Sequence, residues 1–584
     1  FVSWPLHEAE RMVLLPNDIK PQPLHETLAQ VLMLCDQWRS LDGHLAVAIK
    51  RMPDLQPHAQ QLQQGLAHMV KRGLLVDAGQ LSQNYAEPAS PEPAPESIQT
   101  LYVRTYRCPQ ALERLLQSLQ TGRASASLHT LVVVDDAREE SDVELSRLLL
   151  EAWRPRLSAQ VIHVTRADRE RLADALAAAS GANAEDLRWW LNGDPDDPEM
   201  TAGATFNTAL LLSAGTATAI MDDDAQLTPY GDPQDASQLG VAGDEEVHWS
   251  MYSSREAMES AWPPLDIDPL AAHGRWLGQS LSALVTEASS PEIFWQAITS
   301  ADLHGLQPHA VVKVSVNGIL GDPGTGQASW LYTQPSEQLR PWLQSEDTYK
   351  QLVSRRLLAR QPQGHKLLPH HSLLSPLVGV DNRQLMPPTI PNGRGEDALF
   401  VELACCVYPD SLFIQLPWML KHTPEQERQF DRDSLLNPTA MGSNRLLTRY
   451  LRKLRHSVPS AAPDTRLQWL GHSLQALAQA PETTLASEYR RHLTADRSGM
   501  AQELVRNLRA LQPPPYLAKD MQLLLKRCCQ GIESDQTELD AILAQVRQRA
   551  SRYSQALASW HTAWEYCRQQ GEAQALAMAK QESV

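Results

Sequence analysis

The stretch Ala217-Thr218-Ala219-Ile220-Met221-Asp222-Asp223-Asp224 is a short apolar run that ends in three adjacent carboxylates, shortly after a helical pattern breaks at Gly215. Such a run, bounded by a glycine and by aspartates, is typical of a buried strand. Adjacent like charges repel one another unless a cation compensates them, and Mg²⁺ or Mn²⁺ prefers carboxylate oxygens. We therefore expect a strand with a cation site at its end, whereas an isolated Asp triplet would be a solvated acidic turn.

Strands and helices alternate along the residues that precede this stretch. The elements expected from apolar runs and from helical spacing are, in order, a strand at 101–103, a helix that begins at Pro109, a strand at 131–134, a helix near 140–152, a strand at 161–164 and a helix near 168–180. This order predicts an α/β protein with a doubly wound, mostly parallel sheet. Ligands bind such sheets beyond the carboxyl ends of the strands, so the site residues should follow the strands.

Composition divides the rest of the chain. The proline- and glutamate-rich run from Glu87 to Glu96 predicts an extended linker over 85–98. Helical periodicity predicts a helical C-terminal region over 431–584. The chain should then consist of a small module at 1–84, the linker, an α/β domain at 99–430 and the helical region.

The N-terminal module has two apolar helical patterns, at 24–35 and at 59–70, and Gly73 should end the second. Leu74-Leu75-Val76 then predicts a short strand, which makes the module winged-helix-like. Its role is either docking or peptide binding. DNA binding is disfavoured because the second helix offers few basic side chains.

The formal net charge of −17 argues against general nucleic-acid binding, which requires a basic face. No segment reaches the roughly eighteen consecutive apolar residues that a membrane-spanning helix needs, and the first residues lack the pattern of a secretory signal. The seven cysteines are odd in number and lack the spacing of zinc or redox motifs. We therefore expect a reduced, cytoplasmic protein with no nucleic-acid partner and no transmembrane segment.

Two later segments carry residue types suited to proton transfer and metal binding. Glu396-Asp397 follows the turn-like run Asn392-Gly393-Arg394-Gly395, and His422 precedes Thr423-Pro424. A carboxylate can take the proton of a weakly nucleophilic hydroxyl, and imidazole is a common metal ligand. Taken alone, the Glu-Asp pair would be expected at the N-terminus of a helix. Taken alone, the histidine would be expected to have a structural role. The order of strand, acid cluster, Glu-Asp pair and histidine in one α/β domain, which resembles that of a known enzyme family, favours a joint functional role over these structural ones.

Over roughly residues 99–430 these segments resemble the GT-A glycosyltransferases. Asp222-Asp223-Asp224, with Asn207 about fifteen residues upstream, is similar to the Asp-x-Asp motif of that family, and Glu396-Asp397 is similar to the Glu-Asp motif of its inverting members. The resemblance implies a metal-dependent, inverting transfer of a sugar from a nucleotide-sugar donor to an acceptor hydroxyl. Mn²⁺ or Mg²⁺ would neutralise the charge on the leaving diphosphate.

The resemblance also implies roles for single residues. Asp224 is expected to be a direct metal ligand, Asp222 to contact the ribose or the metal, and His422 to complete the metal shell. Asp397 is expected to be the general base, and Glu396 to orient the acceptor or the neighbouring backbone. The residues expected to contact the nucleotide are Thr105, Arg107, Asp135, Asp136, Asn207, Asp222 and Asp223.

The chain departs from the family pattern in two places. Phe206 stands where the family usually has an arginine before the asparagine, and Arg166, after the third strand, could compensate by gripping the diphosphate. Residues 225–330 are poorly patterned and are interpreted as an insertion that bears acceptor-side loops. Within them, the glycine-rich run 318–326 is expected to be a mobile loop or a plain turn.

Two other functions and two acceptor classes stay open. A nucleotidyltransferase acting on a sugar phosphate would share the sheet and the acidic ligands, but it should have a glycine-rich basic loop where this chain has Arg104-Thr105-Tyr106-Arg107. A non-catalytic nucleotide-sugar-binding scaffold is the other alternative. The N-terminal pattern resembles the small peptide-binding domains of pyrroloquinoline-quinone biosynthesis, which would favour a protein or peptide acceptor. If the module only docks, a glycan acceptor is equally favoured.

Overall fold

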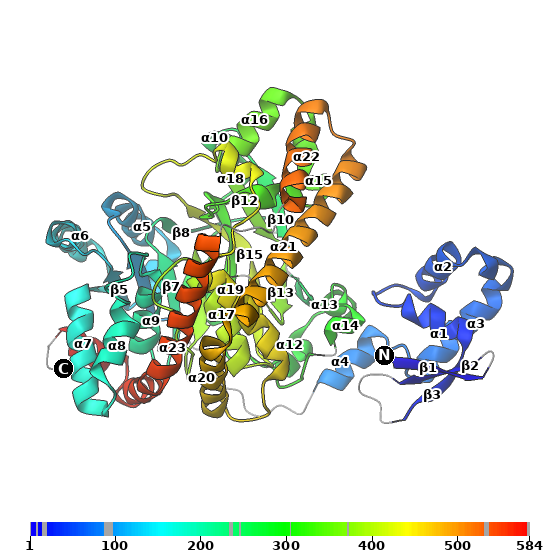
Figure 1. Ribbon diagram of the computed structural model, residues 1–584, viewed down its shortest axis with the longest axis horizontal. Coiled ribbons are helices and arrows are strands. Elements are labelled where there is room, and N and C mark those ends of the chain that lie inside the picture. Colours follow the sequence, from blue (N-terminus) through cyan, green and yellow to red (C-terminus); the bar gives the residue numbers. More distant parts are fainter. Residues whose placement is uncertain are drawn as a thin grey trace.

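A 12-stranded sheet forms the centre of the computed structural model, which describes residues 2–7, 10–14, 20–86, 97–232, 238–244, 247–303, 305–370, 373–530 and 536–580. Its main path runs in the order β6-β5-β4-β7-β14-β11-β15-β13-β9, and β8, β10 and β12 pair beside it (Figure 1). The strands are β4 (Thr100–Thr105), β5 (Thr130–Asp135), β6 (Gln160–Val164), β7 (Ala217–Asp222), β8 (Ala225–Tyr230), β9 (Leu239–Val241), β10 (Val247–Met251), β11 (Val312–Gly321), β12 (Leu358–Pro362), β13 (His365–Leu368), β14 (Leu377–Asp381) and β15 (Leu412–His422).

The part of the sheet predicted from the sequence is parallel. β4 pairs in parallel with β5 and β7, and β5 pairs in parallel with β6. β14 runs in the opposite direction, whereas β11 and β15 return to the direction of β4. The carboxyl ends of β4, β5, β7, β11 and β15 therefore open on one edge of the sheet. The predicted α/β class is confirmed.

Helices cover both faces of the sheet because successive strand residues point to opposite sides. On β4, Tyr102 belongs to one core cluster, and Leu101 and Val103 belong to the other. The helices on the Tyr102 side include α7 (Arg166–Ser180), α8 (Ala184–Asn192), α9 (Ala202–Leu212) and α17 (Glu396–Val407). Those on the other side include α5 (Pro109–Thr121), α6 (Glu140–Trp153), α11 (Pro269–Gly274), α12 (Leu281–Glu287) and α13 (Pro291–Trp295).

Two breaks predicted from the sequence occur where expected. Pro109 lies in the first turn of α5, where its missing N–H leaves no hydrogen bond unmade. α9 ends at Leu212, and Gly215 has a φ of 92° before β7 begins. That left-handed conformation favours glycine, which has no Cβ.

The first half of the glycine-rich run 318–326 is part of a strand and not the loop or turn expected from the sequence. Gly318 and Gly321 lie in β11, which is buried along its length. A Cβ at Gly318 would meet the backbone oxygen of Arg360 at 2.1 Å, and one at Gly321 (φ 120°) would meet that of His422 at 2.5 Å. The glycines permit close approach of neighbouring strands. Because glycine is also common in turns, the sequence alone does not distinguish the two uses.

The described region after residue 431 is helical. Its longer helices are α19 (Ser443–Leu454), α20 (Pro463–Gln479), α21 (Glu482–Leu511), α22 (Pro515–Cys529), α23 (Gln536–Gln570) and α24 (Glu572–Lys580). α23 packs against α8, α19 and α20, so the region is joined to the sheet rather than appended to it (Figure 1). Within the described ranges no helix has both the length and the hydropathy needed to cross a membrane.

The N-terminal module differs from the winged-helix-like arrangement expected of it. A three-stranded antiparallel sheet, β1 (Val2–His7), β2 (Glu10–Leu14) and β3 (Gln22–His25), precedes the helices α1 (Glu26–Met33), α2 (Leu41–Arg51) and α3 (Ala59–Lys71). The strand expected at Leu74-Leu75-Val76 is absent: Gly73 takes a φ of 71° and the Leu74 N–H donates to Met69 O, which closes the end of α3.

The module is joined to the α/β domain through α4 (Ala78–Tyr85), which packs against α12 and α13. The Tyr85 ring packs against Trp295 in a tilted arrangement, with 5.1 Å between ring centroids, and the Trp295 indole donates to Ser82. The predicted linker run, 87–96, lies outside the described residues.

Candidate active site

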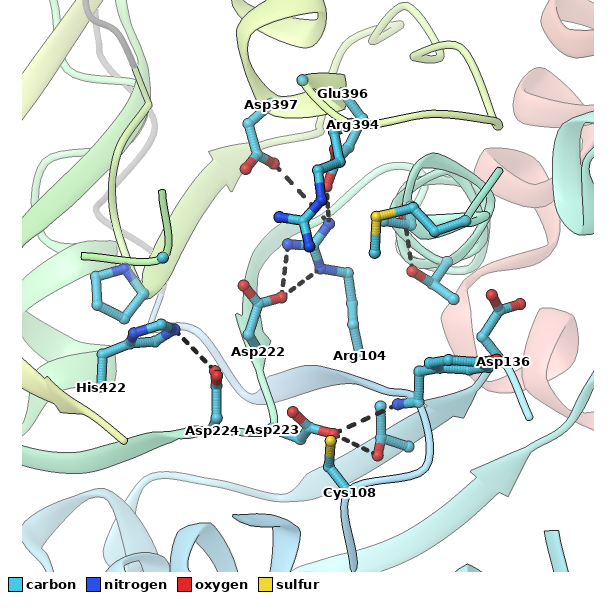
Figure 2. A pocket seen from close by; sticks show the side chains of 18 of the residues that line it. Arg104, Cys108, Asp136, Asp222, Asp223, Asp224, Arg394, Glu396, Asp397 and His422 are labelled. Atoms are coloured by element: carbon cyan, nitrogen blue, oxygen red, sulfur yellow. Dashed lines mark hydrogen bonds and ion pairs between the residues drawn. The ribbon is translucent and has the colours of Figure 1, made fainter. Parts of the chain in front are cut away.

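A cavity of about 630 Å³ opens at the carboxyl edge of the parallel strands. The ends of β4, β5, β7 and β15 and the start of α17 line it, together with the loop between α8 and α9 (Figure 2). The sequence-predicted residues that line it are Thr105, Asp136, Asp222, Asp223, Asp224, Glu396, Asp397 and His422. Segments up to about 300 residues apart in sequence thus line one cavity.

Arg104, the penultimate residue of β4, lies at the centre of this cavity. Its guanidinium donates to Asp222 at 2.6–2.9 Å and to Glu396 at 3.3 Å, and lies 3.9 Å from Asp397 (Figure 2). These carboxylates outweigh the effect of burial and raise the pKa of Arg104. Arg104 thereby joins the acid cluster to the Glu-Asp pair, a link that sequence analysis missed.

The three aspartates at the end of β7 point in different directions. Asp222 faces Arg104, whereas Asp223 is buried and accepts hydrogen bonds from the Thr105 hydroxyl at 2.6 Å and from the Tyr106 N–H at 3.4 Å. Burial raises the pKa of Asp223 well above its ordinary range, and Asp224 adds to the shift. Asp223 and Thr105 thus tie the end of β4 to the turn after β7.

Asp224 and His422 form a pair across the cavity floor. His422 Nε2 lies 2.9 Å from Asp224 Oδ1, and Nδ1 lies 2.6 Å from the backbone oxygen of Asp322. Burial alone would lower the pKa of His422, but Asp224 outweighs it and raises the pKa to about 9. A proton on Nδ1, donated to the carbonyl, leaves Nε2 free to act as a ligand once its own proton is lost.

The donor set suits a cation that needs few protein ligands. In the described ranges no cluster of three or more His, Cys, Asp or Glu side chains could hold a metal, so Asp222 does not join Asp224 and His422 in one ready-made shell. Asp224 and His422 lie 2.9 Å apart, at hydrogen-bond distance. Two neighbouring ligands of one octahedral cation are separated by about 3 Å as well. Mg²⁺ sites often combine only one or two carboxylates with water and substrate phosphates.

Glu396 and Asp397 are the first two residues of α17, after Gly395 in a left-handed conformation (φ 91°). Asp397 faces the cavity with 39% of its side chain exposed, yet the surrounding walls and the neighbouring Glu396 charge raise its pKa well above the ordinary range. A carboxylate with a raised pKa is a stronger base than a free one. The pair therefore begins a helix and faces the cavity at once.

The second strand end supplies one residue to the cavity and buries the other. Asp136 lines the cavity and accepts from Arg166 and Arg169, each at 2.7 Å, and from Thr201. Asp135 is fully buried beneath it, where it lies 3.0 Å from His163 Nε2 and accepts from the Ala137 N–H.

Arg166 and Arg107 lie outside the cavity. Arg166 is engaged with Asp136 and with the backbone oxygen of Asn192, and lines a separate hollow beside α8. Arg107 has a φ of 57°, is more than half exposed and pairs with Asp142 at 2.8 Å.

Asn207 is buried in α9 and faces the segment that leads to α17. Its amide donates to Thr389 O at 2.8 Å and to Trp190 O at 3.2 Å, and its oxygen accepts from the Thr389 N–H at 2.8 Å. The neighbouring Phe206 supports Arg104, whose guanidinium carbon lies 5.5 Å from the ring centroid.

Asn207→Leu should therefore act on stability. We expect a loss of roughly 1–3 kcal/mol for each buried backbone group left unpaired, measured by urea unfolding followed by fluorescence. Nucleotide affinity in the folded variant should stay near that of the unmodified chain. A variant of normal stability with much weaker nucleotide binding would assign Asn207 to the nucleotide instead.

Comparisons with known proteins give matches to solved structures alone. Neither protein-family profiles nor curated protein sequences match the chain. S. aureus TarS 1–349 in complex with UDP-GlcNAc is 13% identical, over 74% of this chain and 91% of that one, with a TM-score of 0.26. The mannosyltransferase PcManGT from Pyrobaculum calidifontis, in complex with GDP-Man and Mn²⁺, is 13% identical, over 77% and 92%, with a TM-score of 0.27. Identities and TM-scores of this size do not transfer an activity to the chain.

Proposed function

We propose that the chain is a glycosyltransferase that moves a sugar from a nucleotide-sugar donor to an acceptor hydroxyl in a metal-dependent, inverting reaction. One observation carries the proposal. The acid cluster after β7, the Glu396-Asp397 pair and His422 line a single cavity at the carboxyl edge of an α/β sheet, in the order that the resemblance to GT-A enzymes implies. A cavity of about 630 Å³ is within the size range of small-molecule sites.

Asp224 and His422 would hold the divalent cation, and Asp222 would contact the ribose or the cation from its place beside Arg104. The cation supplies charge neutralisation to the leaving diphosphate. Because Asp224 raises the pKa of His422 to about 9, loading the site releases a proton from the imidazole.

Asp397 would remove the acceptor proton. It lines the cavity and its pKa is raised, which suits a general base that works near neutral pH. Glu396 pairs with Arg104 at 3.3 Å. It would therefore orient this guanidinium and take no direct part in the proton transfer. The deprotonated hydroxyl would attack the anomeric carbon from the side opposite the leaving diphosphate. Such an in-line attack inverts the anomeric centre.

Arg394 would supply the cationic grip on the diphosphate that Phe206 does not. Its exposed side chain lines the cavity and makes no hydrogen bond or ion pair with the described part of the chain (Figure 2). Arg166, the residue expected to compensate, is already occupied by Asp136.

The acceptor is a protein or peptide if the module at 1–84 recruits one, or a glycan if the module only docks. Its attachment through α4 keeps it beside α13 of the α/β domain. Transfer to both acceptor classes by chains with and without residues 1–76 separates these cases, because this truncation keeps α4 on Trp295.

The function is tested by thermal unfolding with a panel of UDP-, GDP-, dTDP-, CDP- and ADP-sugars, each with Mn²⁺ or with EDTA. A donor at about 100 times its Kd adds about 2.7 kcal/mol of stability, so the matching nucleotide sugar should raise Tm by several degrees with Mn²⁺ only. Consumption of a sugar 1-phosphate with a nucleoside triphosphate would identify a nucleotidyltransferase. Donor binding without release of nucleoside diphosphate would identify a scaffold.

A further inference from the structure

The segment that leads from β14 to Glu396-Asp397 is held by the C-terminal region. Between Asn382 and Gly395 the chain has no helix or strand of its own. From α23, Trp564 Nε1 donates to Asn382 Oδ1 at 3.0 Å, Trp560 Nε1 to Met386 O at 2.9 Å and Tyr553 Oη to Pro388 O at 2.9 Å. These donors, at spacings of 7 and 4 residues, share one face of α23.

Arg549 continues this face of α23 to the residues next to the Glu-Asp pair. It is 5% exposed, and its Nη1 donates to Ser443 and to Asn444 Oδ1, each at 2.8 Å. Asn444 Nδ2 in turn donates to Asn392 O at 3.0 Å and to Arg394 O at 3.2 Å. The backbone immediately before Glu396 is thus fixed through Asn444 by a residue more than 150 positions away in sequence.

Arg549 also holds the opposite wall of the cavity. Its Nη2 pairs with Asp197 at 2.9 Å and with Glu199 at 3.1 Å, in the loop 193–201 between α8 and α9. This loop is joined to the 392–395 turn, because the Gly393 N–H donates to Met200 O at 2.9 Å and the Asp194 N–H donates to Asn392 Oδ1 at 2.8 Å.

A side chain at Gly393 would have to displace the polar ends of three neighbouring side chains. A Cβ on Gly393 would meet Glu199 Oε2 at 2.4 Å, Arg549 Nη1 at 2.7 Å and Asn444 Nδ2 at 2.9 Å. The loop 193–201, the 392–395 turn and Arg549 therefore pack as one unit.

We propose that Arg549 is a positioning residue for the candidate active site, and that α23 helps to set the geometry of that site. By holding the 392–395 turn and the loop 193–201 together, Arg549 sets where Asp397 lies relative to the acid cluster after β7. Part of this claim, the effect on catalysis, rests on the proposed function; the coupling of the two loops does not.

Hydrogen–deuterium exchange of Arg549→Met and Arg549→Lys tests the coupling. Peptides that cover 193–201 and 392–400 should both exchange on the order of tenfold faster in Arg549→Met, with partial recovery in Arg549→Lys. Arg552→Met is the matched control: it lies on the same helix and pairs with Asp186, outside both loops. Should Arg549→Met fail to fold, Asp197→Asn removes one partner of the same arginine and should loosen the 193–201 loop.

Unchanged exchange in both loops, in Arg549→Met or in Asp197→Asn, would overturn the coupling. With the donor identified by the thermal screen, kcat of Arg549→Met should fall about tenfold with the donor KM nearly unchanged, and Arg549→Lys should restore part of it. Faster exchange with an unchanged kcat would overturn the positioning role. Absence of any stabilising nucleotide sugar would count against the proposed function alone, since the exchange result does not depend on it.

Discussion

Asp397→Asn should lower the rate of sugar transfer by about 10²–10⁴-fold, the usual contribution of a general base. The amide keeps the shape of the side chain but cannot accept the proton of the acceptor hydroxyl. Initial rates of nucleoside diphosphate release with a saturating acceptor measure the loss. The affinity for nucleotide and Mn²⁺ should stay close to normal, because Asp224 and His422 are untouched.

The pH dependence of the same reaction should show the direction in which the pKa of Asp397 is shifted. Burial and Glu396 raise the pKa of Asp397, so the base is protonated, and the rate lost, as pH falls through that raised value. Asp397→Asn should remove this limb of the profile. Asp266→Asn, in an exposed pair with Arg123 outside the cavity, controls for the loss of a carboxylate. A fully active Asp397→Asn variant would contradict the assignment of the base.

Asp224→Asn should weaken Mn²⁺ binding by more than the roughly 10–100-fold that even the outer partners of a metal ligand contribute. The substitution removes the negative charge from the proposed ligand, whose pKa His422 holds below its ordinary range although burial opposes it. It also removes the group that raises the pKa of His422. Titration of Mn²⁺ followed by electron paramagnetic resonance, with UDP or another matching nucleoside diphosphate present, measures the affinity.

His422→Gln should show a loss of similar size, because the two side chains are 2.9 Å apart and would share one cation. The double variant should then lose little more than either single one, as expected of residues that act as a unit. Asp266→Asn should bind Mn²⁺ normally. Undiminished Mn²⁺ affinity in both Asp224→Asn and His422→Gln would move the metal elsewhere.

The sequence predicted those residues of the cavity lining whose place depends on the end of a strand. Asp136, Asp222 and Asp224 directly follow or end buried runs, and the carboxyl ends of parallel strands meet at one edge whatever the details of packing. Glu396-Asp397 and His422 were predicted from the resemblance to GT-A glycosyltransferases, in which these residue types follow the acid cluster in this order. In the structure they line one cavity with that cluster.

Other residues could not be assigned in this way because their partners are set by tertiary packing. Asn207 and Asp135 are buried in contacts with the protein itself, which spacing alone does not reveal. Arg104 had a signal: it is a lone charge at the end of the apolar run 101–103. Arg549 had a similar one, an arginine among Val546, Ala550 and Tyr553 on the buried face of α23.

Two secondary-structure predictions were wrong because the same sequence feature occurs in two kinds of structure. Glycine marks a turn or a close approach between strands, and Gly318 does the second. A short apolar run marks a strand or the end of a helix that packs into a core, and Leu74 does the second, at 6% exposed.

Binding of the nucleoside diphosphate itself tests the central claim most directly. Calorimetric titration of the unmodified chain, with the diphosphate of the best nucleotide sugar, should give binding that is about tenfold or more tighter with Mn²⁺ than with EDTA, because the cation neutralises the diphosphate charge. The cation dependence should vanish in Asp224→Asn. Equal binding with and without the cation, or no nucleoside diphosphate that binds at all, would contradict a metal-dependent nucleotide-sugar site in this cavity.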